Sequence, residues 1–389
     1  MLANSRIAIV STVFATLGAP ALAVEYFVYC GTFTAGTAEG IYVSRMDAGT
    51  GILSAPELAM EVQSPNYLAV SPDGRFLIAA TRPSGAEGFV NSYAIIRPGG
   101  RLESIDEKSA GGAGPCHVSV DATGRTVLVA NYNGGSVKSF RIGPDGRLTD
   151  GTFMQHEGSS VNPGRQSGPH AHCFVPAPQG GFALACDLGT DRIMVYRLDP
   201  ADAALLANEP AFATVPPGSG PRHLVFSSDG TRVYVVNEMA CTLSTFAWDA
   251  SRGVLEMRET ISLLPVGVEI ESSFSAAAIV ASPDGRSVFA TVRGHDSVSV
   301  FAADAEGDLS LVENVPCGGQ TPRGLGIDPT GRWLLVGNQK SNLVSVFEID
   351  ANIGGLNVTG RTLSIGSPVD IRFAPAEITA SGSDGSVTQ

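Results

Sequence analysis

Short runs of alternating apolar and polar residues occupy most of the chain, and turn sequences separate them. In "PRHLVFSSDGTRVYVVNE" (residues 221–238), two such runs, 224–226 and 233–236, flank a Ser-Ser-Asp-Gly sequence. Alternation with a period of two indicates a strand with one buried face, and a short Asp-Gly loop between two such runs favours a β-hairpin. The segment therefore predicts two antiparallel strands joined by a tight turn.

This hairpin pattern recurs along the chain at nearly regular spacing. Copies begin at residues 65, 115, 169, 221, 276 and 322, and the first strand appears once more around Pro368. The steps between these starts are 50, 54, 52, 55, 46 and 46 residues. Copies continue into a third alternating run, such as "GSVKSFRI" or "NLVSVFEI", and a weaker fourth. Four antiparallel strands in every repeat of about 45 to 55 residues are typical of the blades of a β-propeller.

The two ends of the repeat array complement each other. The last copy has only its first strand, whereas the N-terminal region offers three more in "EYFVYCGTF", "GIYVSRMD" and "GILSAPELA". Pairing the two ends closes a ring and removes the exposed sheet edges that promote aggregation. We therefore predict an all-β fold, a seven-bladed β-propeller over residues 24–376 closed by joining N- and C-terminal strands. The alternative, an open β-solenoid, has shorter repeats.

The first 23 residues do not follow the blade pattern. Arg6 precedes an apolar stretch at 7–17, and Ala21-Leu22-Ala23 has the small-x-small form of a signal-peptidase site. We expect residues 1–23 to be a cleaved signal peptide, the mature chain to start at Val24, and the protein to be periplasmic or secreted. An uncleaved anchor is the alternative. No stretch of the mature chain has the length of a membrane span, and the polar tail at 377–389 is expected to be disordered.

Composition, net charge and cysteine spacing exclude several classes of structure and binding partner. The chain has 46 Gly and 24 Pro but only 16% charged residues, which suits short strands and many turns better than long helices. A net charge of −13 without a basic block argues against a nucleic-acid surface. The six cysteines are scattered, without C-x-x-C, so neither a zinc site nor a redox pair is indicated. Export would permit disulfides; Cys173 and Cys186 could face each other across one hairpin, or all six could be free buried thiols.

Ionisable and polar residues gather at one end of the predicted hairpins. The start of the first strand and the end of the second share one rim of a blade, so Arg222, His223 and Glu238 should meet there although 15 or 16 residues separate Glu238 from the other two. Other copies contribute further polar residues to this rim: His117, Asn131, His170, His172, Asp187, Arg293, His295, Arg323 and Asn338. The concentration of these groups predicts a solvated pocket at this rim.

Each of these residues also has a structural interpretation. A histidine at a strand start can bond the backbone of a neighbouring blade, and Asn131, Asp187 and Asn338 lie at turn entries where such side chains cap the backbone. Glu238 is harder to explain in this way. Glutamate is a poor turn residue and is costly to bury unless paired. Arg222 could be that partner in a purely structural ion pair.

Six segments in register carry a resemblance to a known family. These are "PCHVSVDATGRTVLVANYNGGSV", "HEGSSVNPGRQSGPHAH", "GSGPRHLVFSSDG", "VNE", "VRGHDSVSVF" and "TPRGLGIDPTGRWLLVGNQKSN". The chain resembles the seven-bladed β-propeller lactonase family, which includes bacterial 6-phosphogluconolactonases and fungal carboxymuconate-lactonising enzymes. The resemblance spans about residues 26–374.

The resemblance implies an active site at one mouth of the channel. Its catalytic residues would be His170, Arg222, Glu238 and Arg293, with His172 as a second candidate for the histidine. The other candidates are expected to bind substrate: His117, Asn131, Arg165, His172, Asp187, His223, Arg323 and Asn338. No metal and no cofactor are expected. The chain departs from the family pattern at Ala278, Val280 and Val292, where relatives often carry polar or charged residues, so one side of the pocket should be less polar.

Lactone hydrolysis requires a base for water, donors for the oxyanion and a proton for the departing ring oxygen. We expect Glu238 or His170 to be the base, Arg222 and Arg293 to hold the oxyanion or a substrate carboxylate, and the remaining member of the Glu–His set to protonate the leaving group. A serine nucleophile is not indicated, since no G-x-S-x-G motif occurs. The expected function is an exported lactonase acting on a small sugar-derived (aldono-) lactone. The alternatives are a lactonising isomerase and a non-catalytic propeller that binds a partner.

Overall fold

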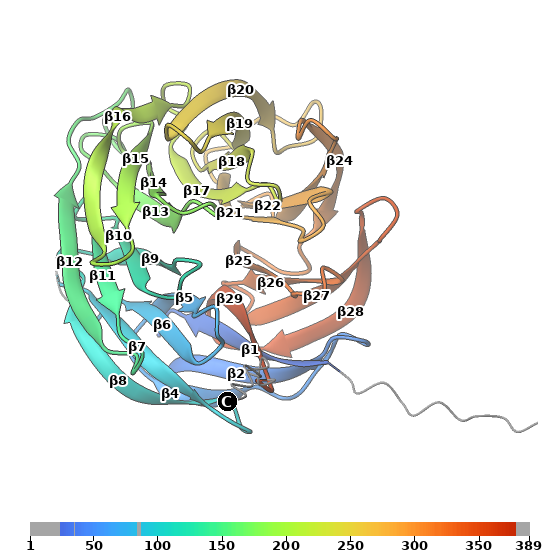
Figure 1. The fold of residues 1–389 in the computed structure, drawn as a ribbon. Coiled ribbons are helices and arrows are strands. Elements are labelled where there is room, and N and C mark those ends of the chain that lie inside the picture. Colours follow the sequence, from blue (N-terminus) through green and yellow to red (C-terminus); the bar gives the residue numbers. More distant parts are fainter. Residues whose placement is uncertain (1–23, 35, 84–86, 379–389) are drawn as a thin grey trace, which may run out of the picture.

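The computed structural model describes residues 24–34, 36–83 and 87–378, and its 29 strands form seven antiparallel sheets arranged in a ring (Figure 1). No α-helix occurs in these three ranges. The sheets are named blades 1 to 7 in the order in which their innermost strands occur in the sequence. The predicted fold, a seven-bladed β-propeller, is confirmed.

Each of the first six blades is a meander of four consecutive strands. Blade 1 comprises β5 (Pro65–Val70), β6 (Phe76–Thr81), β7 (Phe89–Ile96) and β8 (Arg101–Ser109). Blade 2 comprises β9 (Pro115–Val120), β10 (Thr126–Asn131), β11 (Ser136–Ile142) and β12 (Leu148–Gln155). Blade 3 comprises β13 (Ala171–Pro176), β14 (Phe182–Asp187), β15 (Arg192–Asp199) and β16 (Ala204–Thr214).

The next three blades follow the same order. Blade 4 comprises β17 (Pro221–Phe226), β18 (Arg232–Asn237), β19 (Thr242–Asp249) and β20 (Val254–Ser262). Blade 5 comprises β21 (Ser275–Ala281), β22 (Ser287–Arg293), β23 (Ser297–Ala303) and β24 (Leu309–Pro316). Blade 6 comprises β25 (Pro322–Ile327), β26 (Trp333–Asn338), β27 (Leu343–Ile349) and β28 (Leu356–Ser364).

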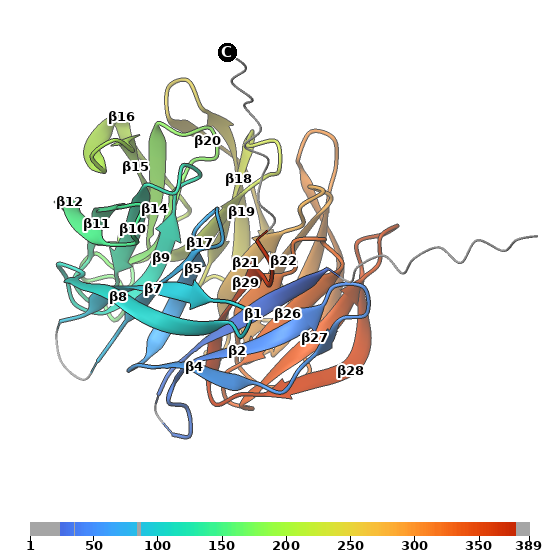
Figure 2. The same ribbon diagram turned by 60° about the horizontal axis from the view of Figure 1, so that its bottom comes forward.

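Blade 7 joins the two ends of the chain. Its innermost strand is β29 (Pro368–Pro375), followed outward by β1 (Glu25–Thr32) and β2 (Gly40–Asp47), and then by the short β3 (Ile52–Leu53) and β4 (Glu57–Glu61), which both pair with β2. β29 pairs with β1 from Tyr26↔Pro375 to Thr32↔Pro368. Figures 1 and 2 show this blade where the blue and red ends of the chain meet. The predicted ring closure is thus confirmed.

Apolar side chains fill the spaces between blades. Between blades 1 and 2, for example, Ile78 packs with Val127, Val129 and Phe140 in one buried cluster. Because every sheet is covered on both faces, its second strand reads as a nearly continuous apolar run such as "FLIAAT" in β6, where all six residues are buried. The alternating pattern expected for these strands holds better in the third strand of blade 3, β15, where buried and more exposed residues alternate over most of the strand.

The hairpin turns are held by side chains of the repeated sequence. In blade 4, the hydroxyl of Ser227 accepts the backbone N–H of Arg232 at 2.9 Å and donates to the carboxylate of Asp229 at 2.5 Å. Gly230 closes the turn with φ of +69°, a conformation that favours glycine. These contacts explain why the Ser-x-Asp-Gly sequence recurs at this end of the blade.

Blade 3 departs from the expected repeat by two residues. Its first strand begins at Ala171, which pairs with Asp187 as Pro221 pairs with Asn237 in blade 4. The repeat pattern instead placed the start at Pro169. His172, and not His170, is therefore the blade-3 equivalent of Arg222.

Two predictions fall outside the described residues: the signal peptide at 1–23 and most of the tail at 377–389. Within the described residues, no helix is long and apolar enough to cross a membrane. All six cysteines are buried and free, and Cys173 and Cys186 are cross-strand partners that share no disulfide. Of the two possibilities left open for the cysteines, the structure has free thiols.

Candidate active site

A cavity of about 230 Å³ lies at the rim where first strands begin and second strands end. Six blades or their connecting loops supply its lining: Asn66, Arg82, Cys116, Tyr132, Asn133, Arg165, His172, Glu238, Arg293 and Arg323. A larger groove of about 630 Å³ lies between blades 5 and 6 at the opposite rim. Its arginines, Arg286 and Arg332, are already paired with Asp284 and Glu348. The smaller cavity differs from this groove because four arginines share its wall with one carboxylate, Glu238, and with His172.

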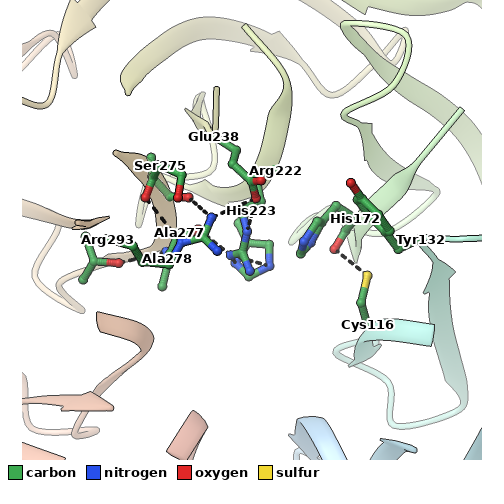
Figure 3. Close-up of polar contacts among 12 residues, drawn as sticks. Cys116, Tyr132, His172, Arg222, His223, Glu238, Ser275, Ala277, Ala278 and Arg293 are labelled. Carbon is green, nitrogen blue, oxygen red and sulfur yellow. Dashed lines mark hydrogen bonds and ion pairs between the residues drawn. The ribbon is translucent and has the colours of Figure 1, made fainter. Parts of the chain in front are cut away.

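Glu238 lies at the centre of this cavity's polar network (Figure 3). Its Oε2 accepts from Arg222 Nε and lies 3.0 Å from both that atom and Arg293 Nη2. Its Oε1 accepts from Arg165 Nη2 at 2.7 Å. The carboxylate of Glu238, a residue only 6% exposed, is thus held by three guanidinium groups from blade 4, blade 5 and the loop before blade 3.

The charges around Glu238 determine its ionisation. Burial by itself would raise the pKa of this carboxyl, but Arg293 and Arg222 outweigh that effect and hold the pKa well below its usual range. Glu238 is consequently ionised at neutral pH. Because both oxygens of this carboxylate are already bound to arginines, it is poorly placed to accept a further proton and well suited to orient those arginines.

Arg222 and Arg293 also bind backbone carbonyl groups of β21. Arg222 Nη1 donates to the carbonyl of Ala277 at 2.6 Å, and Arg293 Nη2 donates to that of Ala276 at 2.8 Å. The β21–β22 register shifts between Ala276 and Ile279. Carbonyl oxygens of this irregular segment therefore supply polar contacts on the side where the sequence predicted a less polar pocket.

His172 and His170 occupy different environments. His172 lines the cavity, is 4% exposed, and has a buried Nδ1 without a hydrogen-bond partner. Burial, and then the charge of Arg222, lowers the pKa of His172 well below 6.5, so its ring is neutral. His170 stacks on Tyr132 with ring centroids 4.5 Å apart, and its Nδ1 lies 2.9 Å from the Tyr132 carbonyl. The neutral ring of His172 is therefore the one placed on the cavity wall.

His223 and His117 are buried and form a cluster of aromatic rings next to His172. The His223 ring is 5.1 Å from that of His172 and 5.6 Å from that of His117, and Tyr67 packs against His117 at 4.2 Å. Arg222 Nη1 lies 3.2 and 3.3 Å from the two ring nitrogens of His223, so it rests against this ring. Burial and the neighbouring Arg222 lower the pKa of His223 well below 6.5. A neutral ring at this place supports the guanidinium of Arg222.

Three predicted substrate-binding residues, Asn131, Asn338 and Asp187, are fully buried, and their side chains form hydrogen bonds with other residues near the same rim. Asn131 Nδ2 donates to the carbonyl of Ala110 and to Ser136, and Asn338 Nδ2 donates to Ser345 at 3.0 Å. Asp187 Oδ2 lies 2.6 Å from His156 Nδ1, and its Oδ1 accepts the N–H of His170. Asn131, Asn338 and Asp187 therefore anchor the loops that carry the cavity residues.

Sequence reasoning missed five residues of the lining: Asn66, Arg82, Cys116, Tyr132 and Asn133. A signal for four of them was present in the repeat. Asn66 and Cys116 occupy the position of Arg222 in their own blades, since each follows the proline that opens the first strand. Arg82 and Tyr132 directly follow the second strand, as Glu238 does.

No three His, Cys, Asp or Glu side chains within residues 24–34, 36–83 and 87–378 are grouped so that they could hold a metal ion. The ionisable groups of the cavity wall are instead four arginines, one glutamate, one histidine, one tyrosine and one cysteine. These groups can bind an anion or a polarised carbonyl and can exchange a proton through the imidazole.

Comparison with known proteins shows the family of the chain. The family model described as lactonase, seven-bladed β-propeller, matches residues 27–373. A curated 6-phosphogluconolactonase of Bacillus subtilis (strain 168) is 32% identical over 351 residues, which cover 90% of this chain and 98% of the relative. The solved structure of a periplasmic gluconolactonase from Pseudomonas aeruginosa aligns with a TM-score of 0.84 at 35% identity, covering 91% of this chain and all of that one. The chain therefore belongs to the seven-bladed β-propeller lactonase family of lactone-hydrolysing enzymes.

Proposed function

We propose that this protein is an exported lactonase that hydrolyses a sugar-derived aldonolactone at the mouth of the propeller without a metal ion. The observation that carries the proposal is the juxtaposition of a neutral His172 with the ionised Glu238 and its arginines on the wall of one small cavity. The volume of about 230 Å³ is below the 300–1,000 Å³ usual for drug-sized ligands, which suits a single sugar-like ring.

The proposed reaction uses His172 as the base. Its neutral imidazole takes a proton from water while the water oxygen attacks the lactone carbonyl carbon. Arg293, which lines the cavity and has a side chain 14% exposed, donates to the oxyanion of the tetrahedral intermediate. The ring C–O bond then breaks, and the imidazolium returns its proton to the departing alkoxide, which yields a hydroxy acid. Glu238 keeps Arg293 in position through their ion pair, and the same carboxylate oxygen also binds Arg222.

Export is supported by the N-terminal sequence pattern and by the similarity to the periplasmic gluconolactonase of Pseudomonas aeruginosa. Sugar phosphates are cytosolic, so an exported enzyme would meet aldonolactones formed by oxidation of sugars outside the cytoplasm. Cell fractionation of the full chain with a tag at Gln389 should recover the protein, shortened by about 23 residues, outside the cytosol. Full-length protein retained in the cytosol would contradict export.

The lactonase activity is tested with residues 24–389 in a pH-indicator assay on gluconolactone, galactonolactone, a carboxylated muconolactone and 6-phosphogluconolactone. We expect hydrolysis of at least one sugar lactone, unchanged by EDTA. Glu238→Gln should lower kcat/KM at least about a hundredfold, because three arginines lose the charge that orients them. Glu256→Gln, a change at an exposed position, is the control. A fully active Glu238→Gln variant would remove Glu238 from the mechanism.

The two histidines make a second, discriminating test. His172→Asn should lower kcat at least about a hundredfold, as expected when a general base is lost. His170→Asn should retain kcat within about tenfold, because this ring packs on Tyr132 and bonds its carbonyl rather than lining the cavity. Steady-state kinetics on the best lactone measure both. The reverse order of effects would assign the base to His170.

The pH profile follows from the shifted pKa values. A lowered pKa means that His172 keeps its neutral, proton-accepting form down to pH values below 6.5. After subtraction of spontaneous hydrolysis, kcat/KM should therefore not fall as the pH is lowered from about 7.5 to about 6.5. An inflection near pH 7 would show that a group other than His172 limits the rate.

A further inference from the structure

Tyr132 lines the cavity, but the proposed reaction gives it no task. It directly follows β10 of blade 2, and its side chain is partly buried. Its ring packs against that of His172 with the two centroids 5.3 Å apart and the ring planes at 75° (Figure 3). The phenol group therefore lies next to the imidazole that takes the proton from water.

The hydroxyl of Tyr132 has a hydrogen that the protein leaves unused. Arg165 Nη2 lies 3.2 Å from the phenol oxygen. A guanidinium group can only donate, so the phenol oxygen accepts in this contact and its own hydrogen is left for another acceptor. Among residues 24–34, 36–83 and 87–378, no acceptor lies within hydrogen-bond distance of this hydroxyl. The O–H group is thus free to donate to a molecule in the cavity.

Neighbouring residues fix the position of the phenol group. His170 stacks on the Tyr132 ring at 4.5 Å with the ring planes 15° apart, and its Nδ1 donates to the Tyr132 carbonyl at 2.9 Å. The backbone N–H of Tyr132 donates to the carbonyl of Gly114 at 2.9 Å. Arg165 is itself held by Glu238 at 2.7 Å. A donor that is already oriented costs no rearrangement when charge develops opposite it, which is what makes such donors effective in catalysis.

The proposed reaction leaves one developing charge without a hydrogen-bond donor. Arg293 donates to the oxygen of the lactone carbonyl, whereas negative charge also builds up on the ring oxygen as the C–O bond breaks. The imidazolium of His172 returns its proton to this ring oxygen, so the oxygen has to lie beside His172. Tyr132 packs against that same imidazole and carries the unused O–H donor.

We propose that Tyr132 is a further catalytic residue, whose phenol O–H donates a hydrogen bond to the ring oxygen of the lactone while the C–O bond breaks. This inference rests on the proposed lactonase function. The electron pair of the broken bond stays on the ring oxygen, the phenol keeps its proton, and the proton from His172 completes the new hydroxyl. Arg165 is a positioning residue, because its donation to the phenol oxygen leaves the hydrogen free and polarises the O–H group.

Tyr132→Phe removes the hydroxyl and keeps the ring that stacks on His170. On the lactone that the wild-type protein hydrolyses fastest, kcat should fall at least about tenfold and KM should stay within about threefold, since this hydrogen bond gains strength only in the transition state. The matched control is Tyr42→Phe, at another partly buried tyrosine, whose hydroxyl accepts the N–H of Glu39 on blade 7. This control should change neither constant. Unfolding midpoints of both variants check that the fold is intact.

The acidity of the phenol separates hydrogen-bond donation from mere packing. Incorporation of a ring-fluorinated tyrosine at position 132 keeps the size of the side chain nearly unchanged but makes its hydroxyl more acidic. An ionised phenol has no hydrogen to donate. As the pH rises, the fluorinated protein should therefore lose kcat at a lower pH than the wild-type protein does. The same replacement at position 42 should leave the pH profile unchanged.

The outcomes separate this inference from the proposed function. If Tyr132→Phe retains kcat within about twofold, or if fluorination at position 132 does not move the pH profile, the catalytic role of Tyr132 is overturned and the lactonase remains. If the wild-type protein hydrolyses no lactone, the proposed function fails and this role fails with it. A loss of kcat in Tyr132→Phe together with a shifted profile in the fluorinated protein supports the inference.

Discussion

The pairing of β29 with β1 is the constraint on which the rest of the structure depends. No single blade can form the cavity, because each of blades 1 to 6 or its preceding loop supplies only one to three of the lining residues. Blade 7 holds blades 1 and 6 at a fixed separation, and it exists only because strands from the two ends of the chain share one sheet. The side chain of Trp333 reinforces this junction, since its Nε1 donates to the Ala48 carbonyl at 2.8 Å between blades 6 and 7.

Within the closed ring, electrostatic interactions among buried charges determine the protonation states of the residues around the cavity. Five arginines approach one another around the cavity: Arg82, Arg165, Arg222, Arg293 and Arg323. Glu238 neutralises only part of this charge, although it contacts three of the five. The same cations keep His172 and His223 neutral, because a charged imidazole would face both desolvation and repulsion. The carboxylate of Glu238 thus stabilises the arginine cluster, and the charge of the cluster in turn keeps the imidazole of His172 neutral.

Buried contacts among neighbouring aromatic rings and at the rim loops support these groups. Arg222 rests against the ring of His223, which packs beside His117 and Tyr67. Asn131, Asn338 and Asp187 bind backbone and side-chain groups at the entries of the rim loops. The sequence analysis did not separate Asn131, Asn338 and Asp187 from the residues that line the cavity, because both groups occur at the same ends of the strands. What separates them is the direction of each side chain, toward the cavity or into the blade.

The sequence by itself determined the seven repeats, the closure by the two chain ends and the rim that carries the polar residues. Those features follow from a period of two, a turn sequence and a spacing, which are local properties of the chain. It also paired Arg222 with Glu238, because both belong to one hairpin. Only the tertiary structure decided that His172 takes the position of Arg222 in its blade, since this depends on where β13 begins to pair with β14. Likewise, Arg165 reaches Glu238 across 73 residues of sequence, and Arg82 shares a cavity with Arg323, only because ring closure brings separate blades together.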